Sequence, residues 1–137
     1  MSASWRIPSV GDIVWCMFPE MPDTEPGPKP RPAIVLSIEV RDDGAPVRVA
    51  YGTSKNLKRL KTGEIAITKS QHPAAYSLAG LAYDTKFDFK VLVDLPWTDQ
   101  YFKVLALNKA GNTPKIGTLH ASVMRAVEAA YRAAMSR

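Results

Sequence analysis

Residues 31–37 read Arg-Pro-Ala-Ile-Val-Leu-Ser, and the four apolar residues 33–36 in their middle form an uninterrupted run. A short run without polar alternation is typical of a strand that is covered on both faces. The preceding segment, residues 19–32, contains six prolines, which fix φ and lack a backbone N–H. We therefore predict that a long surface loop, partly in polyproline geometry, leads into a buried strand.

Four more segments on either side of this run have the composition or the alternation of β-strands. They are residues 13–17, 47–51, 65–67 and 86–93. The last is the clearest, because phenylalanine and valine alternate there with Lys86, Asp88 and Lys90. A shift of one residue would bury all three charges, so we expect the charges to face solvent and the register to be well defined.

The C-terminal segment changes to a helical period. Apolar residues recur there with the spacing of one helix face: Val123, Ala126, Val127, Ala130, Tyr131 and Ala134. Glu128 and Arg132 are spaced for an ion pair on the other side of the same helix. Several short strands followed by one helix predict a mainly β fold with a C-terminal helix, built as a small, strongly curved antiparallel sheet or barrel.

Length, charge and hydropathy narrow the class of protein. A chain of 137 residues fits a single domain, residues 1–137. Its net charge of +5 and its pI near 9.4 favour a polyanionic partner such as nucleic acid. The apolar runs are far shorter than the roughly 20 residues that span a bilayer, and the N-terminus lacks the apolar stretch of a secretory signal. We expect a cytoplasmic protein that does not associate with membranes.

Metal and cofactor chemistry are not indicated. The two histidines and the single cysteine lie far apart in the sequence, and the eight glycines form neither GxGxxG nor GxxxxGKS/T. Cys16 is expected in the core, and His120 at the entry of the terminal helix. His72 precedes Pro73 and is either an exposed loop residue or a general acid or base. We expect neither a metal nor a cofactor.

Two residues near the predicted strand ends are candidates for chemistry on a phosphate. Arg31 lies between Pro30 and Pro32, which would hold a guanidinium fork with little loss of entropy when it binds an anion. Thr53 follows the strand 47–51 in a Gly-Thr-Ser turn, and a threonine needs a neighbour that activates or orients it. The alternatives are a surface arginine at a strand end and an ordinary turn threonine.

The next segment is basic. Residues 55–61 contain Lys55, Lys58, Arg59 and Lys61 and no acidic residue. They form either a solvated loop or a strip that follows a phosphate backbone. Aromatic residues that could stack on unpaired bases are Tyr51, Tyr76, Trp97, Tyr101 and Phe102. Trp15 and Phe87 are assigned to the core instead.

Three of these segments together resemble the PemK/MazF family of toxin endoribonucleases. They are Gly-Asp-Ile-Val-Trp at residues 11–15, Arg-Pro-Ala-Ile-Val-Leu-Ser at 31–37, and the strand that ends in Thr53. Members of that family open with a Gly-Asp-(apolar)-Val-Trp strand, then a variable loop, an Arg-Pro strand and a strand ending in threonine. The resemblance is strong over residues 9–54, weaker over 55–110, and returns in Lys-Ile-Gly-Thr-Leu at 115–119.

The resemblance implies an SH3-like β-barrel with a C-terminal helix, a homodimer, and cleavage of single-stranded RNA without a metal. Arg31 and Thr53 match the family's catalytic arginine and threonine. The implied products are a 2′,3′-cyclic phosphate and a 5′-OH end. RNA contacts are expected from the basic strip together with two neighbours: Tyr51, Ser54, Lys55, Lys58, Arg59 and Lys61. The implied protein partner is an antitoxin whose extended tail competes for the groove, which the proline loop is expected to cover.

Parts of the chain depart from the family pattern. Many relatives carry Asp-Gln in a buried strand where this chain has Asp88-Phe89, and residues 95–102 are longer than expected in a short toxin. The RNA sequence that is cut, the antitoxin and the general base cannot be identified from these residues. The alternative functions are a non-catalytic SH3-like binding module and a gyrase inhibitor similar to the CcdB toxins.

Overall fold

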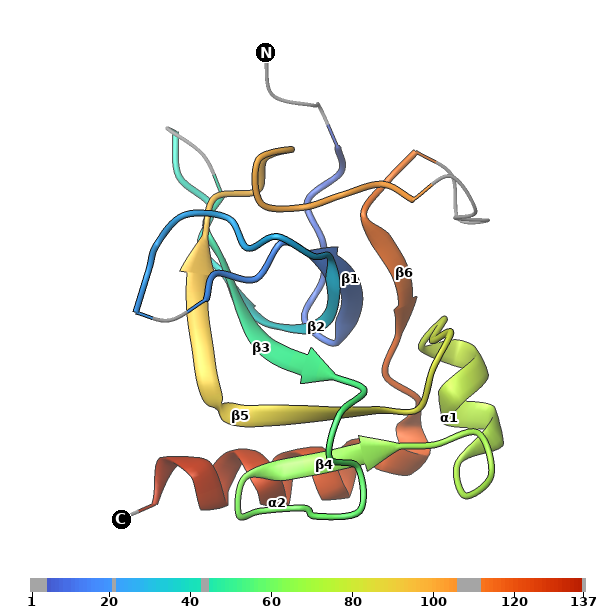
Figure 1. Ribbon diagram of the computed structural model, residues 1–137. Coiled ribbons are helices and arrows are strands. Elements are labelled where there is room, and N and C mark those ends of the chain that lie inside the picture. Colours follow the sequence, from blue (N-terminus) through green and yellow to red (C-terminus); the bar gives the residue numbers. More distant parts are fainter. Residues whose placement is uncertain (1–4, 21, 43–44, 106–111, 137) are drawn as a thin grey trace.

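The computed structural model describes residues 5–20, 22–42, 45–105 and 112–136, and within them it contains one antiparallel sheet and two α-helices (Figure 1). The strands are β1 (Asp12–Cys16), β2 (Arg31–Ile38), β3 (Val47–Thr53), β4 (Glu64–Ile67), β5 (Thr85–Leu95) and β6 (Lys115–Thr118). The helices are α1 (Pro73–Leu78) and α2 (Met124–Met135), the latter preceded by a short 3-10 turn, Ala121–Val123. The strand order is β4-β5-β3-β2-β1-β6. The predicted fold class, a small curled antiparallel sheet with a C-terminal helix, is confirmed.

The sheet curls strongly, and its two faces bury separate hydrophobic cores. One core lies between the sheet and the helices and includes Ile13, Ile34 and Phe87. The other lies on the opposite face and includes Val14 and Val35. Adjacent residues of β1 and β2 therefore belong to different cores, which is why these strands are continuously apolar. The prediction that residues 33–36 are covered on both faces is confirmed.

A sharp bend in β5 allows this one strand to contribute side chains to both cores (Figure 1). Ala50 of β3 pairs with Leu92, but the next residue, Tyr51, pairs with Asp88, so three residues of β5 are skipped in the ladder. Such an insertion bends and twists a strand. Phe87 and Phe89 before the bend pack toward the helices, and Val93 and Leu95 after it pack on the other face.

Helix α2 lies along β4 and β5, as Figure 1 shows. Val127 and Ala130 of the predicted stripe are buried, and Tyr131 packs edge-on against Phe89 with the ring centroids 6.3 Å apart. His120 precedes the 3-10 turn, and its Nδ1 accepts a hydrogen bond from Ser122 N at 3.0 Å, so its predicted role at the helix entry is confirmed. No ion pair joins Glu128 to Arg132, both of which the structure describes, so that expectation is wrong.

Two elements were not predicted from the residue pattern. Helix α1 spans only six residues and begins at Pro73, and β6 spans four. Helix α1 is too short to show a helical period, and β6, Lys-Ile-Gly-Thr, has no apolar alternation. His72 occupies the position before α1, and its Nδ1 accepts a hydrogen bond from Thr68 N at 3.2 Å, which closes the turn that enters the helix.

A buried ion pair holds the loop between β3 and β4 against the sheet. Lys86 Nζ lies 3.2 Å from Glu64 Oε1 and donates a second hydrogen bond to Arg59 O at 3.3 Å. Glu64 Oε1 also accepts from Lys61 N at 2.7 Å. The expectation that Lys86 faces solvent is wrong, because the loop folds over it and leaves it 6% exposed.

The pair shifts the pKa of the Glu64 carboxyl. Burial raises this pKa, but the hydrogen bonds from Lys61 N and Lys86, together with the charge of Lys86, outweigh that effect and lower it. A lowered folded-state pKa stabilises the fold at pH values above the ordinary glutamate pKa, and the stabilisation is lost as the pH falls through the folded value.

Gly52 allows β3 to pass unusually close to its neighbours. A Cβ built at this position would overlap Pro32 O and lie 2.8 Å from Cε1 of the Phe87 ring. Pro32 belongs to β2 and Phe87 to β5, so the missing side chain lets three strands approach one another directly before Thr53. Glycine is required at position 52 because a side chain would not fit, and not because the backbone has a positive φ angle.

We predict that Gly52→Ala lowers the free energy of unfolding by about 1–3 kcal/mol, because the added methyl group must push apart backbone and a core ring. Urea unfolding measures the loss. Ser54→Ala, an exposed change two residues away, is the control and should stay within about 0.5 kcal/mol of wild type. Equal stability of the two variants would contradict the close packing described above.

We predict that Lys86→Met lowers the free energy of unfolding at pH 7 by about 3–5 kcal/mol, because it leaves the Glu64 carboxylate buried without its cation. The double variant Glu64→Leu/Lys86→Met should recover most of that loss. Urea unfolding at several pH values provides a second readout. The advantage of wild type over Lys86→Met should shrink below about pH 4, as Glu64 becomes protonated. A difference that does not depend on pH would contradict the assignment.

Candidate active site

Four strand ends meet at one end of the sheet and enclose a small pocket of about 190 Å³. The pocket is lined by residues from β1, from the start of β2, from the end of β3, and from the segment that leads into β5: Trp15, Pro30, Arg31, Pro32, Gly52, Thr53, Ser54, Leu81, Ala82, Tyr83 and Thr85. In an antiparallel sheet a strand begins beside the end of its neighbour, so the order β5-β3-β2-β1 brings these segments together.

The strand register brings the two candidate catalytic residues to the same place. Ala33 of β2 pairs with Tyr51 of β3, and counting two residues further along each strand places Arg31 opposite Thr53. On the other side of β2, Arg31 pairs with Cys16 at the end of β1. Both Arg31 and Thr53 line the pocket. Two residues far apart in the sequence thus share one surface.

Arg31 is half-buried and lies over an aromatic ring. Its Cζ lies 5.5 Å from the centroid of Tyr51, a distance at which the ring attracts the cation. Tyr51 in turn packs edge-on against Phe18, with 5.1 Å between the centroids. Among the residues that the structure describes, no carboxylate forms an ion pair with Arg31. The guanidinium is therefore held in place without being neutralised.

Thr53 is 9% exposed, and its hydroxyl is held by the backbone that follows it. Its Oγ1 accepts a hydrogen bond from Lys55 N at 3.2 Å. A hydroxyl that accepts one bond still has a hydrogen to donate. Thr53 can therefore donate to an oxygen atom of a ligand in the pocket.

The basic strip runs along the loop between β3 and β4, beside the pocket. Lys55, Lys58, Arg59 and Lys61 are all exposed, and none of them lines the pocket. Ser54 lines the pocket. Tyr51 does not, because its ring packs against Arg31 and Phe18. The strip is anchored at its end by the buried pair of Lys86 and Glu64.

The aromatic residues are distributed differently from what the sequence suggested. Trp97 and Phe102 are buried and pack on each other with centroids 4.5 Å apart, so the expectation that they stack on bases is wrong. Trp15 was assigned to the core, yet it is only half-buried and lines the pocket. Tyr83 also lines the pocket and is 72% exposed. Along β1, Val14 and Cys16 face one core and Ile13 faces the other, so Trp15 shares the face of Ile13 but lies next to the end of the strand, where it is only half-buried.

The remaining sequence candidates lie elsewhere. Tyr76 packs against the core beside the helices, and Tyr101 Oη donates a hydrogen bond to Thr24 O at 2.9 Å. Cys16 is completely buried, and burial raises the pKa of its thiol, which confirms its assignment to the core. The middle of the proline loop is bonded to the residue that follows β1, since Gly27 N donates to Met17 O at 3.0 Å. Of the described loop prolines, those at 30 and 32 line the pocket.

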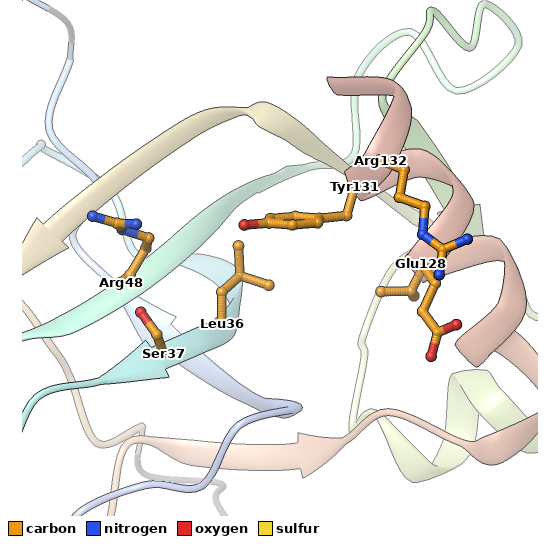
Figure 2. Close-up of a pocket in the computed structure, with 7 residues that line it drawn as sticks. Leu36, Ser37, Arg48, Glu128, Tyr131 and Arg132 are labelled. Carbon is orange, nitrogen blue, oxygen red and sulfur yellow. The ribbon is translucent and has the colours of Figure 1, made fainter. Parts of the chain in front are cut away.

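A second, larger pocket of about 350 Å³ lies between α2 and the strands β2 and β3 (Figure 2). In Figure 2 the Tyr131 ring lies above Leu36, with its hydroxyl directed toward Arg48. The Arg48 guanidinium already binds Asp94 through two hydrogen bonds of 2.7 and 3.0 Å, which lowers the pKa of that carboxyl. Two arginines line this pocket: Arg48 is neutralised by Asp94, and Arg132 forms no ion pair among the residues that the structure describes. Neither is one of the residues that the sequence indicated for chemistry on a phosphate.

The described residues include no group of three or more His, Cys, Asp or Glu side chains placed to hold a metal ion. None of the helices in the same part of the chain is long and apolar enough to cross a membrane.

The fold is similar to that of three mycobacterial proteins of known structure. The toxin MazF-mt6 of Mycobacterium tuberculosis is 20% identical, covers 90% of this chain and 94% of its own, and has a TM-score of 0.58. An endoribonuclease from a mycobacterial species, in complex with its cognate antitoxin, is 16% identical and has a TM-score of 0.60. The match covers 94% of this chain and 95% of the endoribonuclease. Another mycobacterial endoribonuclease is 14% identical and has a TM-score of 0.57, and the match covers 93% of this chain and 90% of that protein.

No curated protein sequence matches the chain closely enough to count as a relative. The model of one protein family, described as the PemK-like, MazF-like toxin of type II toxin–antitoxin systems, matches residues 9–135. That range covers almost the whole chain and includes the pocket and α2. The chain therefore belongs to the PemK-like, MazF-like toxins of type II toxin–antitoxin systems.

Proposed function

We propose that this protein cleaves single-stranded RNA as the toxin of a type II toxin–antitoxin pair, with Arg31 and Thr53 as its catalytic residues. One observation carries the proposal: an arginine without a carboxylate partner among the described residues and a threonine hydroxyl with a hydrogen to donate line the same pocket. Membership of the toxin family supports the same activity.

The proposed reaction uses the RNA's own ribose as nucleophile and needs no metal. The 2′ oxygen forms a bond to the adjacent phosphorus as the bond to the 5′ oxygen breaks, which leaves a 2′,3′-cyclic phosphate and a 5′-OH end. The 2′ hydroxyl loses its proton, and the departing 5′ oxygen gains one. Negative charge accumulates on the phosphoryl oxygens during this step, where a fixed cation stabilises it most.

Arg31 and Thr53 have separate roles in this scheme. The Arg31 guanidinium donates two parallel hydrogen bonds to the phosphate. Because arginine retains its proton, it stabilises negative charge rather than acting as a base. Thr53 donates its hydroxyl hydrogen to the same phosphate or to the attacking oxygen. The residues that line the pocket include no histidine and no carboxylate, so the lining itself supplies neither of the usual general bases.

The RNA backbone follows the basic strip away from the cut. Lys55, Lys58, Arg59 and Lys61 are exposed on one anchored loop next to Ser54. The net charge of +5 adds a general attraction for polyanions. Such contacts increase affinity without selecting a sequence.

The proposal includes an antitoxin partner, a homodimer and a cytoplasmic location. One structural neighbour is described in complex with its cognate antitoxin, and the family model is defined for toxins of toxin–antitoxin systems. The antitoxin would inhibit by occupying the groove that holds RNA. Light scattering of the purified protein tests the dimer directly.

Incubating single-stranded RNA with the protein in excess EDTA and mapping the new ends tests the activity. We expect cuts with 2′,3′-cyclic phosphate and 5′-OH termini. Arg31→Ala should lower kcat by at least about 100-fold, because it removes a charge aimed at the transition state. Thr53→Val should also be impaired, and Thr53→Ser should retain most activity.

Arg48→Ala is the matched control, since Arg48 is exposed and already paired with Asp94. It should cleave like wild type. Full activity in Arg31→Ala would refute the assigned mechanism. Intact RNA with wild-type protein would refute the nuclease and favour a binding module, and inhibition of DNA supercoiling by gyrase would favour the gyrase-inhibitor alternative.

The basic strip is tested through the salt dependence of RNA binding. Each phosphate contact to single-stranded nucleic acid contributes about 0.7 to the slope of log affinity against log salt concentration. Lys58→Gln and Lys61→Gln should each reduce the slope by about that amount, whereas Arg125→Gln on the exposed face of α2 should not. A slope that none of these changes alters would place the RNA elsewhere.

A further inference from the structure

Tyr83 exposes a large aromatic ring at the pocket without a structural reason for it. It is 72% exposed, and among the described residues no aromatic ring packs against it and no hydrogen bond to its hydroxyl is recorded. Yet it lines the same pocket as Arg31 and Thr53. A tyrosine that contributes little to the fold but borders a binding pocket is a candidate for contact with a ligand.

The segment that carries Tyr83 is held firmly on both sides. Leu81 is in the core, and Thr85 Oγ1 donates a hydrogen bond to Tyr83 O at 2.8 Å. The carboxylate of Asp84 accepts a hydrogen bond from Lys69 N at 2.8 Å. The backbone is therefore fixed while the ring is in solvent. A tyrosine on a fixed backbone has only two side-chain torsions to order when it binds, which costs little entropy.

Trp15 contributes a second aromatic face to the pocket. The residues of neither hydrophobic core, as far as the structure describes them, include it. Its backbone is fixed on both sides, since Trp15 N donates to Pro114 O at 3.0 Å and Trp15 O accepts from Lys103 N at 3.1 Å. The backbone of Trp15 is thus fixed, and its indole is half-exposed at the pocket.

The chemistry of the lining indicates what these rings contact. Arg31 and Thr53 suit a phosphate, and two aromatic rings with apolar Leu81 and Ala82 suit a flat, uncharged group. A nucleotide has both parts, because its phosphate is joined to an aromatic base. The volume of about 190 Å³ is smaller than that of a typical pocket for a whole small molecule, so it fits the flat part of one such unit rather than a folded partner segment.

We propose that Tyr83 and Trp15 stack on the base of the nucleotide whose phosphate is bound by Arg31 and Thr53, an inference that rests on the proposed function. Tyr83 provides the accessible platform, and Trp15 forms the fixed part of the pocket. Stacking tolerates every base but favours those with more ring surface. The two residues therefore bias which nucleotide occupies the cleavage position, while the basic strip supplies affinity that is independent of sequence.

The affinity test uses a fluorescein-labelled ten-nucleotide RNA of random sequence with 2′-O-methyl riboses, which lacks the nucleophile and cannot be cut. Tyr83→Ala should weaken binding by roughly 5- to 100-fold, since one stacked base is lost. Tyr83→Phe should bind within about twofold of wild type. Val40→Ala is the control, because Val40 is 73% exposed and follows the end of β2 remote from Arg31. The salt slope should be the same in all four proteins, since no phosphate contact changes.

An abasic substitution separates stacking from any indirect effect. In an oligonucleotide that carries the mapped cut sequence, removal of the base at the cleavage position should weaken binding to wild type more than binding to Tyr83→Ala, which keeps only the Trp15 contact. The same affinity for Tyr83→Ala and wild type would overturn the inference, as would a wild-type protein that is insensitive to every abasic position.

These outcomes differ from a failure of the proposed function. If the wild-type protein binds the methylated RNA with the expected dependence on Tyr83 but does not cleave natural RNA, the nuclease proposal fails and the stacking contact stands. If it cleaves RNA and Tyr83→Ala has the same affinity and the same kcat/KM, the stacking contact fails and the nuclease stands.

Discussion

The antiparallel register of β2 between β1 and β3 is the constraint on which the rest of the structure depends. These strands are buried on both faces, so a slip of one residue would exchange the contents of two different cores. The register that suits Ile34 and Val35 also determines where the strand ends lie. Arg31 is brought beside the end of β1 and opposite Thr53 at the end of β3. Core packing thus positions groups that take no part in it.

The charges of the molecule are arranged so that one cation remains without an acidic partner at the pocket. Lys86 is neutralised by Glu64, Arg48 by Asp94, and the buried Asp12 carboxylate by Lys115 at 3.2 Å. Arg31, in contrast, is held by the face of the Tyr51 ring. A ring attracts a guanidinium but does not cancel its charge, so the field of Arg31 remains available to an anionic ligand.

Most of the fold could be predicted from the residues, because strands covered on one or both faces leave a clear apolar pattern. The five strands expected between residues 13 and 93 and the terminal helix are present. Helix α1 could not be predicted because its six residues are fewer than two helical turns. Strand β6 was missed because Lys-Ile-Gly-Thr contains one apolar side chain and no alternation. The burial of Lys86 was missed because it depends on a loop folding over the strand, which alternation within β5 does not record. Trp15 was misassigned because it lies on a strand that is covered on both faces, and the residue pattern does not show that the cover ends before the last residues of β1, where the pocket lies.

The position of Cys16 has a consequence for the conditions in which the protein can work. It is the sole cysteine of the sequence, its side chain is completely enclosed, and the environment that encloses it disfavours the thiolate. Peroxides and disulfides attack the thiolate form of an accessible sulfur. The folded protein therefore presents no sulfhydryl target to such reagents, and oxidative stress that disables thiol-dependent enzymes would leave this sulfur intact.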